Sequence, residues 1–235
     1  MYNMELKKLG YSDQIYEILR QRIVTLSLPP GRKIDIGKLS REFNVSATPI
    51  REALKRLVER GLVRYRKDTG YWVVPLTDKD VQDIFVLRKV LETFALNESI
   101  HSIRLWEIEG LLKDSRQLLA GDVSESELRK IFDEMDELLH YRLIVGRCKN
   151  EFLKTFYTIM NDYIAIVRHL NERIMAAVEE HVEILEALKR GDLEAAKVSL
   201  ARHLDSSAQA CRPLPRSVEE WEVALEEVSI KKKEV

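Results

Sequence analysis

The chain has 235 residues, 45% hydrophobic and 33% charged, which is typical of a globular protein with one large domain or two small ones. No run approaches the roughly 18 apolar residues that a membrane-spanning helix needs, and no apolar stretch of a signal peptide follows the early lysines. Only Cys148 and Cys211 are present, so neither a disulfide framework nor a CxxC metal site is expected. The sequence therefore predicts a cytoplasmic protein without membrane partners.

The net charge of −1 hides an uneven distribution along the chain. Residues 1–76 contain 15 Lys and Arg against 8 Asp and Glu, a balance of +7, whereas the remainder has a balance of −8. A basic N-terminal third on an acidic body indicates that one end of the chain meets a polyanion such as nucleic acid.

The basic region has the element pattern of a winged helix-turn-helix. Ser12, Asp35 and Ser46 are candidate N-caps of three successive helices whose apolar residues recur at helical spacing. Two β-prone segments, residues 62–66 and 71–75, then flank a glycine-containing link and predict a hairpin.

The rest of the chain predicts an antiparallel helical bundle. Helices are expected near residues 78–101, 104–120, 125–146, 151–169, 172–190 and 193–210, and Gly121-Asp122 and Gly191-Asp192 mark places where one helix stops and the next starts. Short connections of this kind join antiparallel neighbours. The expected fold class is mainly α, with a winged helix-turn-helix in residues 1–76, an all-α bundle in 77–211 and a C-terminal tail in 212–235.

The third helix carries the residues expected to read DNA, because the second helix of the motif enters the major groove with its N-terminal residues on base edges. Thr48 and Arg51 lie in its first turn, and Arg51 can pair with guanine bidentately. Further candidates for DNA contact are Lys38, Lys55, Arg64, Arg66 and Lys67, with Gly70 allowing the hairpin to approach the DNA backbone. The alternative is that these cations only solvate an exposed face.

These residues resemble the winged domain of GntR-family bacterial repressors. The resemblance is carried by Leu28-Pro29-Pro30-Gly31, Leu39–Ser46, Thr48–Leu54 and Arg60–Val63, with their spacing intact. It implies a homodimer on a near-palindromic double-stranded DNA operator, controlled by a small-molecule effector. Two positions depart from the pattern: Ala47 stands where the family usually carries Arg, and Gly37 where some members have a basic residue. Fewer guanidinium contacts imply weaker base readout or a different operator.

Three of the five histidines lie in apolar stripes of the expected bundle helices. His140 follows Asp136 by four residues, so both side chains project from one helix face. His181 precedes Gly191 by 10 residues and His203 follows Asp192 by 11, which places both about 15 Å from that turn. One divalent ion would satisfy all four buried polar groups. The alternative is that each is a hydrogen-bonded core residue.

The bundle is also similar to the FCD effector domain of FadR-like GntR proteins. The metal-binding members carry an Asp-x-x-x-His motif and two later histidines, which correspond here to Asp136, His140, His181 and His203. The resemblance implies one divalent ion per chain, in a site with open positions for an effector carboxylate. Three imidazoles and one carboxylate suit zinc best, with nickel, manganese and iron as alternatives.

Arg88 lies in the apolar stripe of the first bundle helix and is a candidate anchor for an effector carboxylate. Its alternatives are a salt bridge with Glu92 or an interdomain contact. The predicted function is a DNA-binding transcriptional regulator, a repressor, controlled by a small carboxylic acid at the metal. Two alternatives stay open: a regulator for which the metal itself is the signal, and a metalloenzyme fused to a DNA-binding domain. A non-enzymatic role is favoured, because no HExxH-type general base appears.

Overall fold

A computed structural model describes residues 10–121, 124–171, 173–211, 213–215, 217 and 220–221. The chain divides into two compact units, one of residues 79–212 and one of residues 1–78 together with 213–235. The expected domain boundary lies two residues before this division, and the expected separate tail groups with the N-terminal unit. Asp122, the predicted restart after Gly121, and most of the tail lie outside the described residues.

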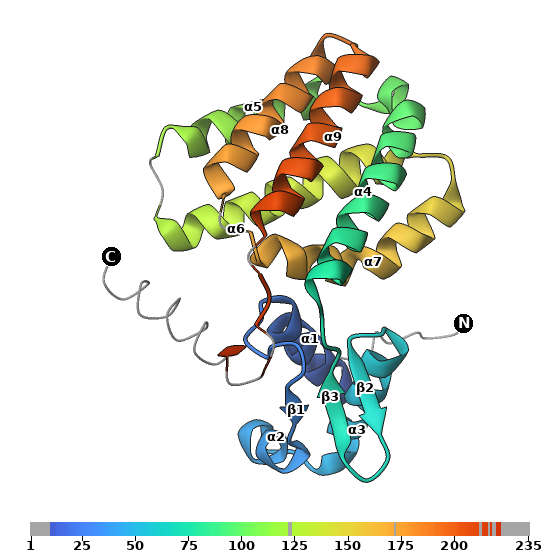
Figure 1. The fold of residues 1–235 in the computed structure, drawn as a ribbon, viewed down its shortest axis with the longest axis vertical. Coiled ribbons are helices and arrows are strands. Elements are labelled where there is room, and N and C mark those ends of the chain that lie inside the picture. Colours follow the sequence, from blue (N-terminus) through green and yellow to red (C-terminus); the bar gives the residue numbers. More distant parts are fainter. Residues whose placement is uncertain are drawn as a thin grey trace, which may run out of the picture. The chain divides into compact units, whose positions relative to one another are not determined.

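The N-terminal unit combines helices with a small antiparallel sheet (Figure 1). Its elements are α1 (Tyr11–Val24), β1 (Lys33–Ile34), α2 (Ile36–Phe43), α3 (Ala47–Glu59), β2 (Val63–Arg66) and β3 (Gly70–Val73), with strand order β1-β3-β2. Strands β2 and β3 form the predicted hairpin, with Arg66 opposite Gly70 at its turn. The sequence did not predict strand β1, because a segment of two residues shows no periodicity. It is a strand only because it pairs with β3, on the side of β3 opposite to β2.

The expected caps occur at two of these three helices. Asp35 caps α2 by accepting a hydrogen bond from the Lys38 amide at 2.9 Å, and Ser46 occupies the N-cap of α3 without a side-chain capping bond. The expectation for Ser12 is wrong, because α1 begins after Gly10, whose amide donates to Asp13 Oδ2 at 3.2 Å. An acidic side chain three residues into a helix can satisfy the N-cap amide in this way.

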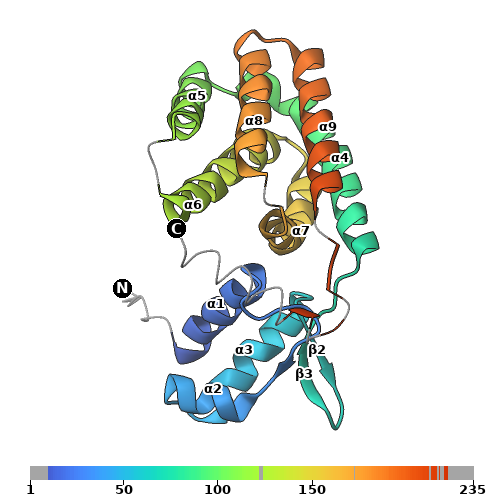
Figure 2. The ribbon, with the colours of Figure 1, turned by 60° about the vertical axis from the view of Figure 1, so that its left-hand side comes forward.

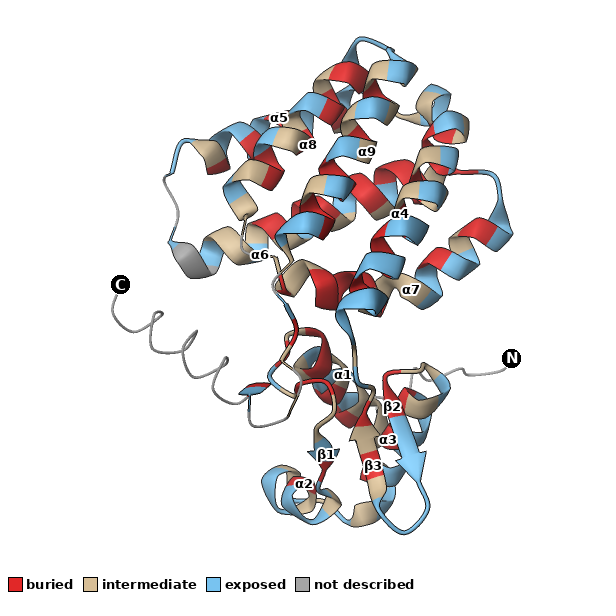
Figure 3. Cartoon of the chain, viewed as in Figure 1, coloured by how far each residue is buried: buried red, intermediate tan, exposed pale blue. Residues whose placement is uncertain are grey.

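Helix α3 is fixed to α1 on its inner side. Leu19, Ile50 and Leu54 are fully buried within this unit, and Figure 3 colours buried segments of its helices red. The guanidinium of Arg56 pairs with Asp13 at 2.6 Å and thereby ties α3 to α1. Because its inner face is occupied, α3 presents its opposite face to solvent.

The C-terminal unit is helical (Figures 1 and 2). The described elements are α4 (Asp78–Ser99), η1 (Ile100–Ser102), α5 (Leu105–Leu119), α6 (Glu125–Asp136), α7 (Glu151–His169), α8 (Ile174–Lys189) and α9 (Leu193–Ala210). Helices α8 and α9 lie side by side as a hairpin, in which Gly191 has a φ of 69° and Asp192 caps α9 by accepting from the Ala195 amide at 3.0 Å. Among the described residues, no helix combines the length and the apolar character needed to cross a bilayer.

The predicted helix over residues 125–146 is not a single regular α-helix. Helix α6 ends at Asp136, the π-helical segment η2 follows over Glu137–Ile144, and the 3₁₀ turn η3 covers Val145–Arg147. In a π-helix each amide bonds five residues back, and such segments are rare and frequent at functional sites. Two of the predicted metal ligands lie at this change of helix type: Asp136 is the last residue of α6, and His140 lies within η2.

Candidate metal centre

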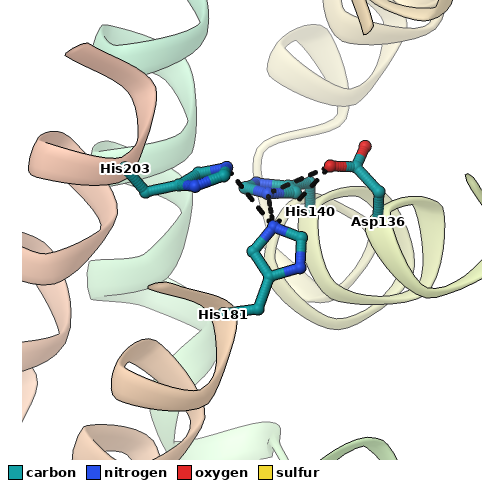
Figure 4. Close-up of side chains that lie close together, drawn as sticks. All are labelled: Asp136, His140, His181 and His203. Carbon is teal, nitrogen blue, oxygen red and sulfur yellow. Dashed lines mark hydrogen bonds and ion pairs between the residues drawn. The ribbon is translucent and has the colours of Figure 1, made fainter. Parts of the chain in front are cut away.

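Four side chains from four helical elements converge in the interior of the C-terminal unit (Figure 4). Asp136 comes from the end of α6, His140 from η2, His181 from α8 and His203 from α9. All four are buried, and one ligand-type atom of each lies within 4.8 Å of the others. These are the four residues that the sequence singled out, and the fold brings all of them together.

The distances within this cluster suit a metal ion. His181 Nε2 lies 3.2 Å from His140 Nε2 and 3.3 Å from His203 Nε2. Asp136 Oδ1 lies 3.6 Å from His140 Nε2 and 3.7 Å from His181 Nε2. Metal–nitrogen bonds of about 2.0–2.1 Å in a tetrahedral site place ligand atoms roughly 3.3–3.4 Å apart. These four separations fall around that value, and all the ligand atoms lie within 4.8 Å of one another, so the residues fit a single divalent ion.

The protonation states of the cluster also suit metal binding. Burial, together with the nearby His203 and His140, lowers the pKa of His181 well below its ordinary value, and burial lowers the pKa of His203 as well. Burial would raise the pKa of Asp136, but Arg168 and His140 outweigh it and hold that pKa below its usual range. At neutral pH His181 and His203 therefore offer imidazole lone pairs and Asp136 a carboxylate, donors that divalent transition metals accept.

Two further carboxylates bind the imidazoles on the side away from the cluster. Glu92 Oε2 lies 2.6 Å from His140 Nδ1, and Glu180 Oε2 lies 2.8 Å from His203 Nδ1. A carboxylate that accepts from Nδ1 fixes the ring orientation and makes Nε2 a more basic ligand. His181 Nδ1, by contrast, is buried with no hydrogen-bond partner among the described residues. Two of the three rings are thus oriented for ligation by paired acidic side chains.

Arg88 is buried on α4, where its Nε donates to Glu92 Oε1 at 2.8 Å. This contact is the salt bridge that the sequence left open as an alternative to effector binding. The hydroxyl of Tyr157 donates to the same oxygen at 2.7 Å. Burial would raise the pKa of Glu92, but Arg88 and His140 outweigh it and lower the pKa to about 2. Arg88 Nη2 remains buried with no hydrogen-bond partner in the described part of the chain.

A small cavity of about 20 Å³ lies beside the cluster. Its lining includes Arg88, Asp136, Arg168, Asn171, Arg173 and His203. Arg168 Nη1 donates to Asp136 Oδ2 at 2.6 Å, and Arg173 Nη1 donates to Glu180 Oε2 at 2.9 Å. A cavity of this volume holds about one water molecule. A larger ligand therefore requires neighbouring side chains to move.

The predicted DNA-contacting residues lie on the surface of the N-terminal unit. Lys38 on α2, Thr48, Arg51 and Lys55 on α3, and Arg64, Arg66 and Lys67 on the hairpin are all exposed. Unlike Arg56, which pairs with Asp13, Arg51 makes no ion pair with any residue that the structure describes. Gly70 has a φ of 90°, so its place at the hairpin turn has a conformational reason.

Sequence reasoning missed two residues beside the hairpin, Lys33 and Trp72. Lys33 Nζ lies 5.6 Å from the centre of the Trp72 ring, and the Arg66 guanidinium lies 5.7 Å from it. Cations within about 6 Å of an aromatic ring are attracted to its face. Trp72 therefore gathers cations from β1 and β2, an arrangement that only the pairing of β1 with β3 reveals.

Comparison with known proteins identifies both units. Residues 11–73 match the family of bacterial regulatory proteins called gntR, and residues 83–206 match the FCD domain. The chain belongs to the GntR family and carries an FCD domain. It is therefore a DNA-binding transcriptional regulator of the GntR/FCD type.

Relatives of this GntR regulator span nearly its whole length. It is 29% identical over 221 residues to YdhC, an uncharacterised HTH-type transcriptional regulator of Bacillus subtilis, covering 91% of this chain and 95% of that protein. It is 26% identical over 220 residues to the HTH-type transcriptional repressor RspR of Escherichia coli, covering 89% and 92%. A GntR-type regulator from Rhodococcus sp. RHA1 has the same fold, with a TM-score of 0.67, 20% identity, and coverage of 85% and 96%.

The buried position of Arg88 in this GntR regulator leads to a stability prediction. Arg88→Met should destabilise the C-terminal unit by about 3–5 kcal/mol, because the Glu92 carboxylate then loses its cationic partner inside the protein. Arg116→Met breaks the exposed pair with Glu186 and should cost at most about 1 kcal/mol. Urea unfolding followed by circular dichroism measures both variants. An equal loss of unfolding free energy in the two variants would contradict the prediction that the buried Arg88–Glu92 pair contributes more to stability than an exposed pair.

Proposed function

We propose that this GntR regulator is a repressor whose operator affinity depends on a divalent metal ion at Asp136, His140, His181 and His203. The observation that carries the proposal is the convergence of these four buried ligand atoms. Zinc suits the donor set best, with nickel, manganese and iron as alternatives. RspR, which is similar over most of both chains, is named a transcriptional repressor, which supports the sign of regulation. The related proteins are named as regulators, which supports a non-enzymatic role.

The proposed effector is a small hydroxy- or dicarboxylic acid that binds at the ion. When bound, the ion supplies a positive charge to which an effector carboxylate can coordinate. The cavity beside the cluster is lined by Arg88, Arg168 and Arg173, which favours an anion over a neutral sugar. Arg88 lines this cavity, and its Nη2 has no hydrogen-bond partner among the described residues, so the predicted effector-binding role of Arg88 is compatible with its salt bridge to Glu92.

A second candidate function is a regulator for which the metal itself is the signal. The cavity volume of about 20 Å³ favours it, because that space holds a water molecule and no larger acid without rearrangement. Operator affinity measured with metal alone, and then with metal plus a panel of small acids, distinguishes the two. A response to metal alone identifies the metal as the signal, and a response that requires an acid identifies the acid.

The metal prediction concerns individual ligands. The wild-type protein should bind one divalent ion per chain. His181→Ala should weaken zinc binding by roughly 100-fold or more, because it removes one of the four ligands, and loss even of a group that only orients a ligand costs about 10–100-fold. His169→Ala should leave affinity unchanged, because His169 lies outside the cluster and contacts the Ala165 carbonyl. Calorimetric titration of zinc into chelator-treated protein, with elemental analysis, gives both values.

Metal loading should also raise the melting temperature of the wild type, because a ligand of the native state adds stability. Full metal content in purified His181→Ala would contradict the assignment of the site.

The DNA prediction separates base reading from phosphate contact. Arg51→Ala should cost about 1–3 kcal/mol of specific binding and relax the preference at one operator position. Lys67→Ala should weaken binding to all sequences alike and lower the salt slope by about 1. Both residues are exposed on the N-terminal unit, so neither change should unfold it. Gel-shift titrations at several salt concentrations test this, and an unchanged sequence preference in Arg51→Ala would reject base reading.

We infer a homodimer from apolar side chains exposed on the C-terminal unit. Helix α4 exposes Val86, Val90 and Phe94, and α7 exposes Phe152, Phe156 and Ile159, each with at least 49% of its surface accessible. Helix α4 also buries apolar side chains inside the unit, among them Ile84, Phe85 and Leu96, so it carries apolar residues on more than one side. A helix of that kind is normally covered on each of these sides.

A second copy of the chain fits this face. Val90 lies near the middle of α4, so two antiparallel copies of α4 would place Val86 of one against Phe94 of the other and Val90 against itself. Such a two-fold contact is self-complementary. A dimer would also supply two winged domains, one for each half-site of a near-palindromic operator.

Val90→Glu should therefore convert the dimer to monomers, because a two-fold contact brings the two introduced carboxylates together. Val198→Glu is the matched control, since Val198 is 67% exposed on α9, and it should leave the association unchanged. Sedimentation velocity at micromolar concentration distinguishes the two species. A wild-type-like sedimentation coefficient for Val90→Glu would exclude the α4 face.

A further inference from the structure

The small sheet of the winged unit has one buried side and one outer side. Residues that pair across antiparallel strands point to the same side of a sheet. The buried side carries four apolar or aromatic residues, Ile34, Val63, Tyr71 and Val73. On the other side, Lys33 and Arg64 both lie opposite Trp72, one from each neighbouring strand, and Arg66 lies two residues beyond Arg64. We call Lys33, Arg64, Arg66 and Trp72 the outer face.

Two cations of the outer face lie over the ring of Trp72. Lys33 Nζ is 5.6 Å from the ring centre and the guanidinium carbon of Arg66 is 5.7 Å from it. These two residues come from strands on opposite sides of β3. The ring itself is tied to the hairpin turn, because Trp72 Nε1 donates to Thr69 Oγ1 at 3.4 Å. Trp72 therefore determines where a cation from β1 and a cation from β2 lie.

The three cations of the outer face keep their charges. In the part of the chain that the structure describes, none of them pairs with a carboxylate, whereas Arg56 of the same unit pairs with Asp13. A carboxylate cancels the charge of its partner, but an aromatic ring orders a cation and leaves the charge in place. Like charges held close together also repel one another. A bound anion would offset that repulsion.

We propose that the outer face binds the phosphate backbone of operator DNA, with Lys33 as a further contact residue and Trp72 as the residue that positions Lys33 and Arg66. The inference rests on the proposed contact between the hairpin and DNA. Gly70 lies opposite Arg66, and a Cβ at Gly70 would meet nothing within 4 Å, so the turn end of this face is open. Several unpaired cations on one face match the repeated charge of a phosphate backbone, which a single base edge does not offer.

The test for Lys33 is the salt dependence of DNA binding by the full-length protein at constant metal content. The two probes are an operator selected in vitro and a duplex of unrelated sequence. Lys33→Ala should weaken binding to both alike and lower the salt slope by about 0.9 for each bound winged domain. Lys197→Ala is the matched control, because it removes the same charge from an ion pair with Glu194 on α9, and its slope should equal that of the wild type. An unchanged slope in Lys33→Ala overturns the phosphate contact.

The test for Trp72 compares two replacements. Trp72→Phe keeps an aromatic ring, whereas Trp72→Leu keeps only an apolar side chain. Trp72 is half-buried, so the domain should fold in both variants, which circular dichroism checks. Trp72→Leu should weaken binding to both duplexes by about 5–30-fold, the equivalent of two cation–π contacts, and Trp72→Phe should retain most of the affinity.

A double-mutant cycle separates positioning from a merely structural role of Trp72. If Trp72 positions Lys33, Lys33→Ala should cost less affinity in the Trp72→Leu protein than in the wild type, because Lys33 is no longer held there. If Trp72 only supports the sheet, the cost is the same in both proteins. Equal costs overturn the positioning role.

Arg66→Ala distinguishes failure of this inference from failure of the proposed hairpin contact. If Arg66→Ala and Lys67→Ala both leave the salt slope unchanged, the hairpin does not contact DNA and both proposals fail. If these two changes lower the slope and Lys33→Ala does not, the hairpin contact stands and the role of Lys33 is overturned.

Discussion

The carboxylate of Glu92 is the group on which the interior of the C-terminal unit depends. It is completely buried, and isolation of such a charge from water would cost several kcal/mol. Arg88 and Tyr157 satisfy one of its oxygens and His140 the other. These contacts join α4, η2 and α7 around one acid, and they set the orientation of a predicted metal ligand. The contacts of Glu92 therefore determine both how these helices pack and how the ring of His140 is oriented.

The charges around the cluster bear on the proposal that an anionic effector binds at a metal here. Arg88 is matched by Glu92, and Arg168 contacts two carboxylates, Asp136 and Asp133. Arg173 and Glu180 form a further pair. These groups carry one more carboxylate than guanidinium, so a divalent cation would leave a single excess positive charge in a region of low dielectric. Under the proposed function, an effector carboxylate would offset that excess, whereas a neutral ligand would not.

The four ligands were predictable because local geometry places them. A separation of four residues puts Asp136 and His140 on one helix face, and matched distances from the Gly191-Asp192 turn bring His181 level with His203. The wing hairpin was predictable for similar reasons, since glycine at its turn and β-prone flanks are local signals. What these features share is that a few neighbouring residues suffice to specify them.

Features that depend on distant residues were not predictable in the same way. Glu92 and His140 are 48 residues apart, so the sequence showed Glu92 only as a neighbour of Arg88. Strand β1 has two residues and exists only because β3 lies beside it. The N-cap of α1 is Gly10 and not the predicted Ser12, because the side chain of Asp13 in the first turn accepts a hydrogen bond from the Gly10 amide. The sequence left three roles open for Arg88 because helical position alone does not decide which group a guanidinium contacts.

The π-helical segment after Asp136 gives the site an unusual sensitivity to chain length. Because η2 winds with more residues per turn than an α-helix, it accommodates one residue that a regular α-helix would not. Loss of a single residue between Asp136 and His140 would rotate His140 about the helix axis, away from His181 and His203, by somewhat less than the about 100° that one residue spans in an α-helix. Substitutions of residues around the ligands leave the direction of His140 about the helix axis unchanged, whereas a deletion changes it. The direction in which His140 points therefore depends more on the number of residues in this segment than on the identity of its exposed residues.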